Sequence, residues 1–166
     1  MSKNVRMLSL GAGVQSTTVA LLAVHGEIEK PEHAIFADTK WESKQVYLHL
    51  EWLTPILEDA GISVHVVSKG NLREDTLSQK RGIQIPVHMK HESGGGGMSM
   101  RQCTFDYKIQ PILKKQRQLL GIEYRQKWKP EHGTITNLMG ISVDEIQRAK
   151  DNPTKYITNE FPLLDL

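Results

Sequence analysis

The first residues that could do chemistry are the run SLGAGVQSTT at positions 9–18, which follows an apolar segment and precedes a helical one. Small residues let the backbone bend so that its N–H groups converge on an anion, and a helix N-terminus adds partial positive charge. Ser16 and Thr17 add hydroxyl donors. The run is not a Walker loop, because no Lys precedes the Ser/Thr, and it lacks the third Gly of the dinucleotide fingerprint. It indicates either a phosphate site or an ordinary tight strand–helix junction.

The second candidate is the segment ADTKWE at positions 37–42, which follows another apolar run. A carboxylate such as Asp38 could accept hydrogen bonds from a ribose or hold a magnesium ion through water. The alternative is structural. Asp38 or Thr39 would then cap the following helix, with Glu42 in its first turn.

The third candidate is the segment RQCTFDYKIQP at positions 101–111. Arg101, Thr104 and Lys108 at a helix start could clamp a second phosphate or a sulfate. The thiol of Cys103, close to Arg101, could have a lowered pKa, or Cys103 could be a small residue that fills the core.

Two further groups give weaker signals. Asp144 and Arg148, within the segment GISVDEIQR at positions 140–148, have the spacing of an i,i+4 ion pair on a helix. His88 and His91 are three residues apart and could touch one metal ion, but no third ligand is near in the sequence. We therefore assign no metal ligands, and a surface loop is the alternative for the two histidines.

The elements that must position these residues alternate between strands and helices. Apolar runs predict strands at 5–10, 32–37, 62–67 and 134–141, with 155–158 also extended. Helical spacing predicts helices at 16–24, 42–60, 71–79 and 105–120, and a short one opening with a capping box at 142–145. We expect a Ser/Thr cap on the first helix, a kink or break near Thr54 before Pro55, and a stop at Gly121. Ile109, Ile112, Leu113 and Leu120 would form the buried side of the fourth helix.

This alternation predicts an α/β, Rossmann-like fold with a parallel sheet of about five strands and helices on both faces. The length of 166 residues predicts one domain over residues 1–166, and no internal repeat is visible. The run SGGGG at positions 93–97 predicts a flexible loop near 90–100. Ligands of such sheets bind at the carboxyl ends of the strands, which is where the first, second and fourth candidate segments fall.

Composition and charge narrow the class of protein. The chain is 39% hydrophobic, 24% charged and 6% aromatic, with no apolar run near the roughly 20 residues of a membrane span. A single cysteine excludes an intramolecular disulfide and a multi-cysteine zinc site. We expect a cytoplasmic protein with no membrane association. Net charge is only +2, but residues 101–129 carry eight basic side chains against two acidic ones, which suits an anionic ligand or a solvated helix face.

Taken in order, the four segments SLGAGVQSTTVALL, FADTKWE, RQCTFDYKIQP and MGISVDEIQR resemble the adenine-nucleotide alpha-hydrolase superfamily. Within it, the likeness is greatest to PP-loop proteins of the phosphoadenosine phosphosulfate (PAPS) reductase-like family, including phage and bacterial members of unassigned substrate. The resemblance covers nearly the whole chain and implies a HUP-type arrangement of the Rossmann-like sheet.

The resemblance can be carried over residue by residue. The PP-loop pattern Ser-Gly-Gly-X-Asp-Ser falls on residues 11–16, with Gly11 for the first Ser, Ala12 for a Gly and Gln15 for the Asp. The segment Asp-Thr-Gly-Trp-Glu at the nucleoside end falls on residues 38–42, with Lys40 for Gly. The phosphate or sulfate segment falls on Arg101, Cys103, Thr104, Lys108 and Pro111. The resemblance then implies a nucleotide site made of residues from these three segments: Ser9, Gly11, Ala12, Gly13, Gln15, Ser16, Thr17, Asp38, Thr39, Cys103 and Thr104.

The resemblance implies an enzyme that acts at the alpha phosphate of ATP or a related nucleotide and releases pyrophosphate, with Ser16, Arg101 and Lys108 in catalytic roles and Mg²⁺ assisting. One alternative is a PAPS reductase. The C-terminal nucleophilic cysteine of such reductases has no match here, and the ending FPLLDL leads us to expect a longer natural chain. The other alternative is a non-catalytic nucleotide-binding module of a modification or defence complex, which the replacement by Gln15 favours. A tRNA or DNA substrate, a protein partner and a homodimer are further expectations.

Overall fold

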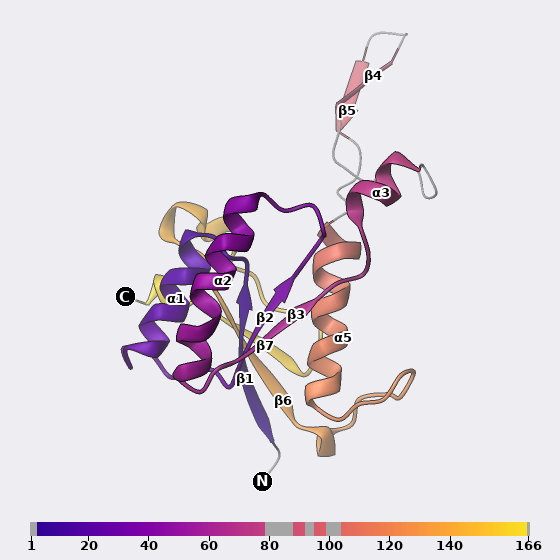
Figure 1. Cartoon of the computed structure of the whole chain (residues 1–166). Coiled ribbons are helices and arrows are strands. Elements are labelled where there is room, and N and C mark those ends of the chain that lie inside the picture. Colours follow the sequence, from indigo (N-terminus) through magenta and orange to yellow (C-terminus); the bar gives the residue numbers. More distant parts are fainter. Residues whose placement is uncertain (1–2, 79–87, 92–94, 99–103, 166) are drawn as a thin grey trace.

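The computed structural model describes residues 3–78, 88–91, 95–98 and 104–165. Its centre is a sheet of five parallel strands in the order β3-β2-β1-β6-β7. The strands are β1 (Asn4–Leu10), β2 (His33–Ala37), β3 (Ser63–Val67), β6 (Thr134–Met139) and β7 (Ile157–Glu160). The α/β, Rossmann-like fold expected from the sequence is confirmed (Figure 1).

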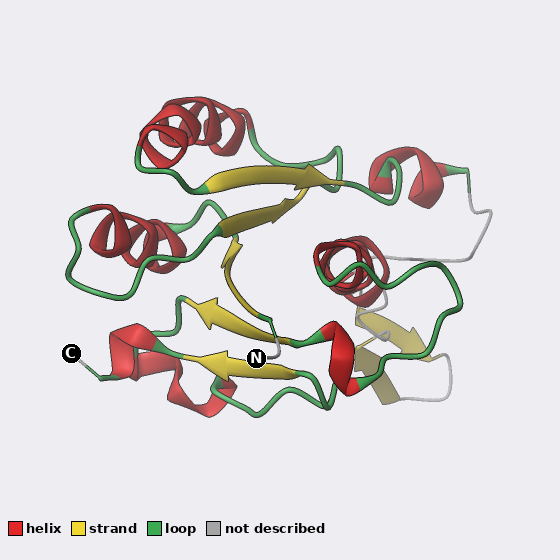
Figure 2. Ribbon diagram, turned by 90° about the horizontal axis from the view of Figure 1, so that it is seen from below, coloured by secondary structure: helices red, strands yellow, loops and turns green. Residues whose placement is uncertain are grey.

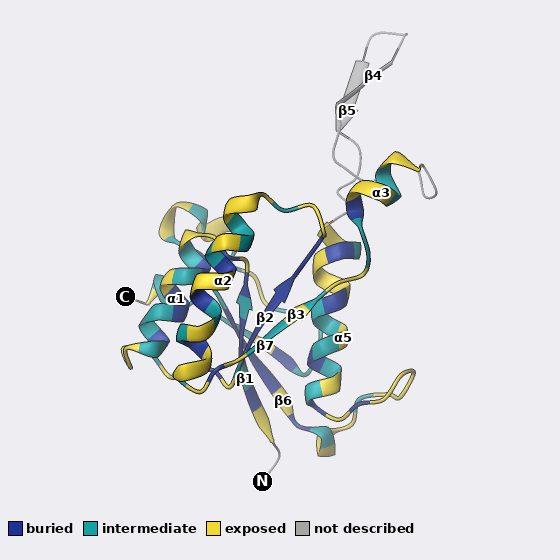
Figure 3. Ribbon diagram, viewed as in Figure 1, coloured by how far each residue is buried: buried dark blue, intermediate teal, exposed yellow. Residues whose placement is uncertain are grey.

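Helices cover both faces of this sheet because both faces of its strands are apolar. Along β1, Leu8 and Leu10 face α1 (Val14–Val24) and α2 (Lys44–Asp59), whereas Val5 and Met7 face α5 (Gln110–Leu119). Figure 2 shows α1 and α2 on one side of the sheet and α5 on the other. The central strands β1, β2 and β6 are therefore mostly buried, as Figure 3 shows for β2, whereas the edge strand β3 contains no buried residue.

The order of the strands reverses at β1. The chain runs outward from β1 through β2 to β3, and then returns to the opposite side of β1 to form β6. In open parallel sheets the ligand site lies beside the carboxyl ends of the strands at such a reversal. The residues after β1 and after β6 therefore occupy the position where a site is expected.

Four of the expected helix details are wrong. The N-cap of α1 is Gly13 with no side-chain cap, since the hydroxyl of Ser16 bonds to other atoms of the loop. Helix α2 continues through Pro55 without a break, and Thr54 Oγ1 donates to the carbonyl of Leu50 at 2.7 Å. Residues Val143–Arg148 form a 3₁₀ helix without a side-chain cap. The helix at 105–120 opens with a π-helical turn, Phe105–Ile109, that leaves Ile109 43% exposed instead of buried.

Smaller elements complete the described chain. Helix α3 (Leu72–Leu77) is capped by Asn71, and Gly121 follows α5 at a φ of 69°. Residues β4 (His88–His91) and β5 (Gly95–Met98) pair as antiparallel strands, so 95–98 form a strand where the sequence predicted a loop. Figure 1 shows this hairpin beyond α3, away from the sheet. No helix of the described ranges is long and apolar enough to span a lipid bilayer.

Candidate functional site

The loop after β1 bends sharply and leaves a row of backbone donors without partners. Ala12 has a φ of 52°, in the left-handed region that non-glycine residues seldom adopt. The N–H groups of residues 12–16 donate to no atom of the described chain, and the regular bonding of α1 begins when Thr17 N donates to Gly13 O at 3.0 Å. Gly13 and Val14 are exposed, Gln15 is half-buried, and Ala12 and Ser16 are buried, so the middle of this row of donors lies at the surface. The loop can accept an anion with several oxygen atoms.

Ser16 holds this loop in shape. Its hydroxyl accepts a hydrogen bond from the N–H of Gly11 and donates one to the carbonyl of Gly13, both at 3.2 Å. The side chain is buried beneath the bend. Ser16 therefore acts on the geometry of the loop, and the unpaired amides are those around it.

The loop after β6 packs directly against the loop after β1. A Cβ atom on Gly140 would lie 2.5 Å from the backbone of Gln15 and of Ser16, so only glycine fits there. Gln15 Nε2 also donates to Ser142 Oγ at 3.4 Å. These contacts join the two loops at the reversal of strand order. The sequence marked the segment 140–148 as a candidate but did not show that Gly140 sets this approach.

Two residues that were expected at the nucleotide site instead contact side chains of neighbouring elements. Thr17 Oγ1 lies 2.8 Å from His49 Nε2 on α2. Ser9 Oγ donates to Asn137 Oδ1 at 2.8 Å, and Asn137 in turn donates to Asn159 on β7 at 3.1 Å. The row of Ser9, Asn137 and Asn159 links the carboxyl halves of β1, β6 and β7 on the α5 face. The sequence did not single out the two asparagines, because amides inside apolar strands have no motif.

Asp38 ends β2 as a buried carboxylate with three donors. Its Oδ1 accepts from Lys40 N at 2.8 Å and from Tyr47 Oη at 2.9 Å, and its Oδ2 pairs with Lys40 Nζ at 2.8 Å. Burial alone would raise the pKa of Asp38, but the bonds from Lys40 and Tyr47 outweigh it and lower the pKa. Asp38 therefore stays ionised. Neither Asp38 nor Thr39 caps α2, whose N-cap is Ser43. The helix begins at Lys44, so Glu42 precedes it instead of lying in its first turn.

Lys40 has an unusual backbone conformation, with a φ of 60°. Its side chain is about half exposed and lies over the Asp38 carboxylate. Burial of Tyr47 raises the pKa of its phenol, and the bond to Asp38 raises it further, so Tyr47 remains a donor. Neither Lys40 nor Tyr47 was predicted as a site residue.

Thr39 and Glu42 connect this segment to the π-helical turn that precedes α5. Thr39 is buried, and its Oγ1 donates to Glu42 Oε1 at 3.0 Å. The same carboxylate pairs with Lys108 Nζ at 3.1 Å. Lys108 is thus brought to the edge of the sheet that carries Asp38. Thr104 precedes the π-helical turn and is exposed, whereas Arg101 and Cys103 lie outside the described residues.

The remaining candidates are the predicted ion pair of Arg148 and the two histidines of β4. Arg148 pairs with Glu145 at 2.7 Å, so the predicted pair with Asp144 is wrong. His88 and His91 lie on β4, but their side chains are outside the described part of the chain. Two surface hollows, of about 490 and 690 Å³, lie elsewhere and include no residue of 11–16 or 38–42.

Comparison of the chain with protein-family models, with curated proteins and with solved structures finds no match in any of the three. The functional argument therefore depends on the residues and the geometry described above.

Proposed function

We propose that the chain is an adenine-nucleotide-binding enzyme domain of the PP-loop type, which acts at the alpha phosphate of ATP or a related nucleotide. The observation that carries the proposal is the set of N–H groups at residues 12–16, which have no acceptor in the described chain and lie where the strand order reverses. A polyphosphate offers several oxygen acceptors to such a set, and the N-terminus of α1 favours its negative charge.

The backbone conformation supports the resemblance at two positions where the residue types depart from the motif. The resembled family has glycine at the positions of Ala12 and Lys40, and these have φ values of 52° and 60°. Among the described residues, Arg125 is the one other non-glycine residue with a positive φ. Both departures from the motif therefore keep the conformation that glycine adopts most readily. This agreement favours the resemblance even though the sequence differs from it at both positions.

In the proposed reaction, the backbone amides and the cationic side chains have different roles. An acceptor group attacks the alpha phosphorus and forms a new bond to it, the bond from phosphorus to the bridging oxygen breaks, and negative charge gathers on the departing pyrophosphate. The amides of residues 12–16 would hold that charge, with Ser16 keeping their geometry. Lys108, held by Glu42 at the same edge, would supply a cation. The same role is proposed for Arg101 from the resemblance alone.

The described residues do not fit a magnesium site of their own. Asp38 already accepts from Lys40 and Tyr47, Glu42 pairs with Lys108, and Gln15 stands where the resembled motif has Asp. Within the part of the chain that the structure describes, no three or more His, Cys, Asp or Glu side chains lie together so that they could hold a metal ion. We assign no catalytic step to magnesium.

Calorimetric titration with ATP, AMP and PAPS, followed by chromatography of the products, tests the proposal. We expect ATP to bind with a micromolar Kd, about −7 to −8 kcal/mol, and AMP to bind more weakly because it lacks the two terminal phosphates. Formation of AMP and pyrophosphate would support action at the alpha phosphate. Release of sulfite from PAPS with thioredoxin present would instead assign the reductase alternative. Absence of binding by both ATP and PAPS would overturn the proposal.

A further inference from the structure

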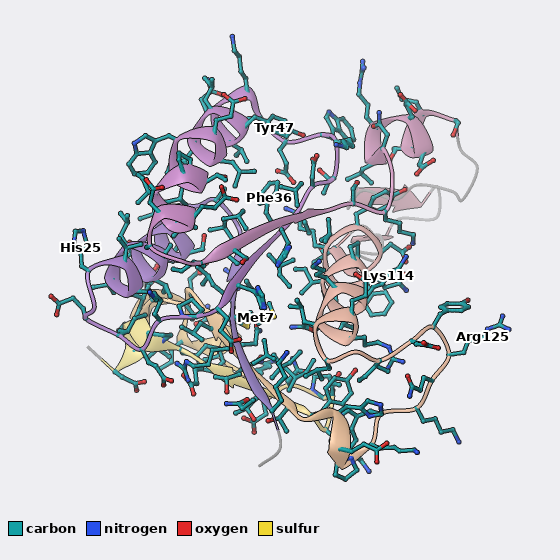
Figure 4. The ribbon with its side chains drawn as sticks, turned by 60° about the horizontal axis from the view of Figure 1, so that its bottom comes forward. Met7, His25, Phe36, Tyr47, Lys114 and Arg125 are labelled. Atoms are coloured by element: carbon teal, nitrogen blue, oxygen red, sulfur yellow. The ribbon has the colours of Figure 1, made fainter. Side chains whose placement is uncertain are left out.

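A second surface with binding character runs along α5, away from the loop after β1. It is a hollow of about 690 Å³, here called the α5 hollow, and its lining includes Lys69, Lys114, Arg117, Glu123, Tyr124 and Arg125. Pockets for a ligand of nucleotide size are typically about 300–1,000 Å³. Figure 4 shows Lys114 on α5 and Arg125 on the loop that follows this helix, on the side of the molecule away from α1 and α2.

The α5 hollow is positively charged. Glu123 is its single carboxylate, against four cationic side chains. Lys69 Nζ forms an ion pair with Asp106 Oδ1 at 2.9 Å. In contrast, Lys114, Arg117 and Arg125 form no ion pair with any residue of the described chain. Arg117 donates to the backbone carbonyls of residues 123 and 126, which are neutral and leave its charge intact. Three cations therefore remain available to an anionic ligand.

An aromatic ring stands beside these cations. Tyr124 is 86% exposed, and the guanidinium carbon of Arg125 lies 5.2 Å from the centre of its ring. Arg125 has a φ of 65°, a conformation that is uncommon for a side chain of its size. An exposed ring with neighbouring cations can stack a nucleobase and bind the adjoining phosphates. The guanidinium of Arg125 lies over this ring, which otherwise remains mostly in water.

We propose that the α5 hollow binds a single-stranded nucleic acid, with a base stacked on Tyr124 and phosphates beside Lys114, Arg117 and Arg125. Unpaired bases are required for stacking, whereas a duplex presents only its phosphates to this surface. The hollow begins at Ser68 and Lys69, directly after β3, and thus at the edge of the sheet that carries the candidate nucleotide site. Binding of a nucleic acid is inferred from this surface alone. That the nucleic acid is also the acceptor substrate is a second step, and this step depends on the proposed function.

Fluorescence anisotropy with labelled dT and U oligomers of about 12 nucleotides tests this binding on the full chain without ATP. We expect Tyr124→Ala to weaken binding about tenfold and Tyr124→Phe, which keeps the ring, to bind within about twofold of the wild type. Lys114→Ala should weaken binding and reduce the slope of log K against log salt by about 0.7. Trp52→Ala, which removes an exposed ring on α2, and Lys155→Ala, outside the hollow, are matched controls that should bind normally.

Three results would overturn the inference. The first is unchanged binding by Tyr124→Ala. The second is a duplex of the same length bound as tightly as the single strand. The third is poly-glutamate bound with the same dependence on Tyr124, which would point to an acidic protein. The Ser16→Ala variant separates this inference from the proposed function, because it should lose affinity for ATP and keep affinity for the oligomer. A preference between the dT and U oligomers would show whether DNA or RNA is the ligand.

Discussion

At the scale of single residues, the loop after β1 depends on one hydroxyl. Ser16 Oγ links the N–H of Gly11 to the carbonyl of Gly13, and it thereby fixes the bend that leaves the next five N–H groups unpaired. A residue in this position does not need to touch a ligand to control its binding. It sets the spacing of the donors that do.

Ser16→Ala should therefore affect both stability and binding. Loss of two hydrogen bonds is expected to lower the free energy of unfolding by about 1–3 kcal/mol, and the relaxed loop should weaken ATP binding by a similar amount. Urea unfolding and calorimetric titration measure the two effects. Thr18→Ala is the matched control, since Thr18 is exposed and its hydroxyl donates only to the carbonyl of Val14. A Ser16→Ala protein with unchanged ATP affinity would contradict the role given to this hydroxyl.

The sequence allowed some of these residues to be predicted but not how they act. Residues 11–16 were identified because small residues between a strand and a helix have a recognisable pattern. The left-handed backbone of Ala12 and Lys40 could not be anticipated, because neither residue type favours it. The partners of Asp38 were also unforeseen, since Tyr47 reaches it from the next helix.

At the scale of elements, long periodic patterns were predictable and local interruptions were not. The four main strands and the body of each helix follow from apolar spacing. Pro55 does not break α2, because the helix packs on the sheet through Leu50, Leu53 and Leu57 on both sides of the proline. Tertiary packing here outweighs the local preference of one residue. The pairing of β4 with β5 was missed because a run of glycines carries no strand signal.

The packing of the loop after β6 on α1 gives a prediction at this scale. Gly140→Ala should lower the free energy of unfolding by about 2 kcal/mol or more and weaken ATP binding, because its methyl group would meet the backbone of Gln15 and Ser16. Gly13→Ala is the matched control for stability, since a Cβ atom there has nothing within 4 Å. Thermal unfolding compares the two variants. Equal stability of both would contradict the close approach of the two loops.

The strands β2 and β3 carry a pair of histidines that makes stability depend on pH. His65 Nε2 lies 3.2 Å from His33 Nδ1. Burial lowers the pKa of both imidazoles, nearby Lys115 lowers them further, and Glu32 opposes the shift at His33. The unfolded chain therefore binds more protons than the folded one. This contribution to stability is complete above about pH 7 and is lost as the pH falls through the ordinary value near 6.5.

Urea unfolding between about pH 8 and pH 5 should show this loss of stability in the wild type and a smaller one in His65→Gln. At pH 8 both imidazoles are neutral in both states, so the difference there measures the change in packing and in the bond to His33. An identical pH dependence in the two proteins would show that this pair does not titrate as described.

At the scale of the whole molecule, the order of the strands decides where chemistry can occur. The fold class followed from the alternation of strands and helices, but the reversal between β1 and β6 is a property of the assembled sheet. It brings together loops that are about 125 residues apart in the chain, as the contact between Gln15 and Ser142 shows. The α5 hollow is lined by other residues than the loops after β1 and β6, so the proposed oligomer and the proposed nucleotide would contact different side chains.

The most direct measurement of the central claim is a ¹H–¹⁵N correlation spectrum of the labelled protein during titration with ATP. The account predicts that the backbone amide signals of residues 12–16 shift most, because their N–H groups gain phosphate acceptors, and that Ser16→Ala reduces these shifts. Amide signals that stay unchanged at 12–16 while ATP binds elsewhere on the protein would contradict it.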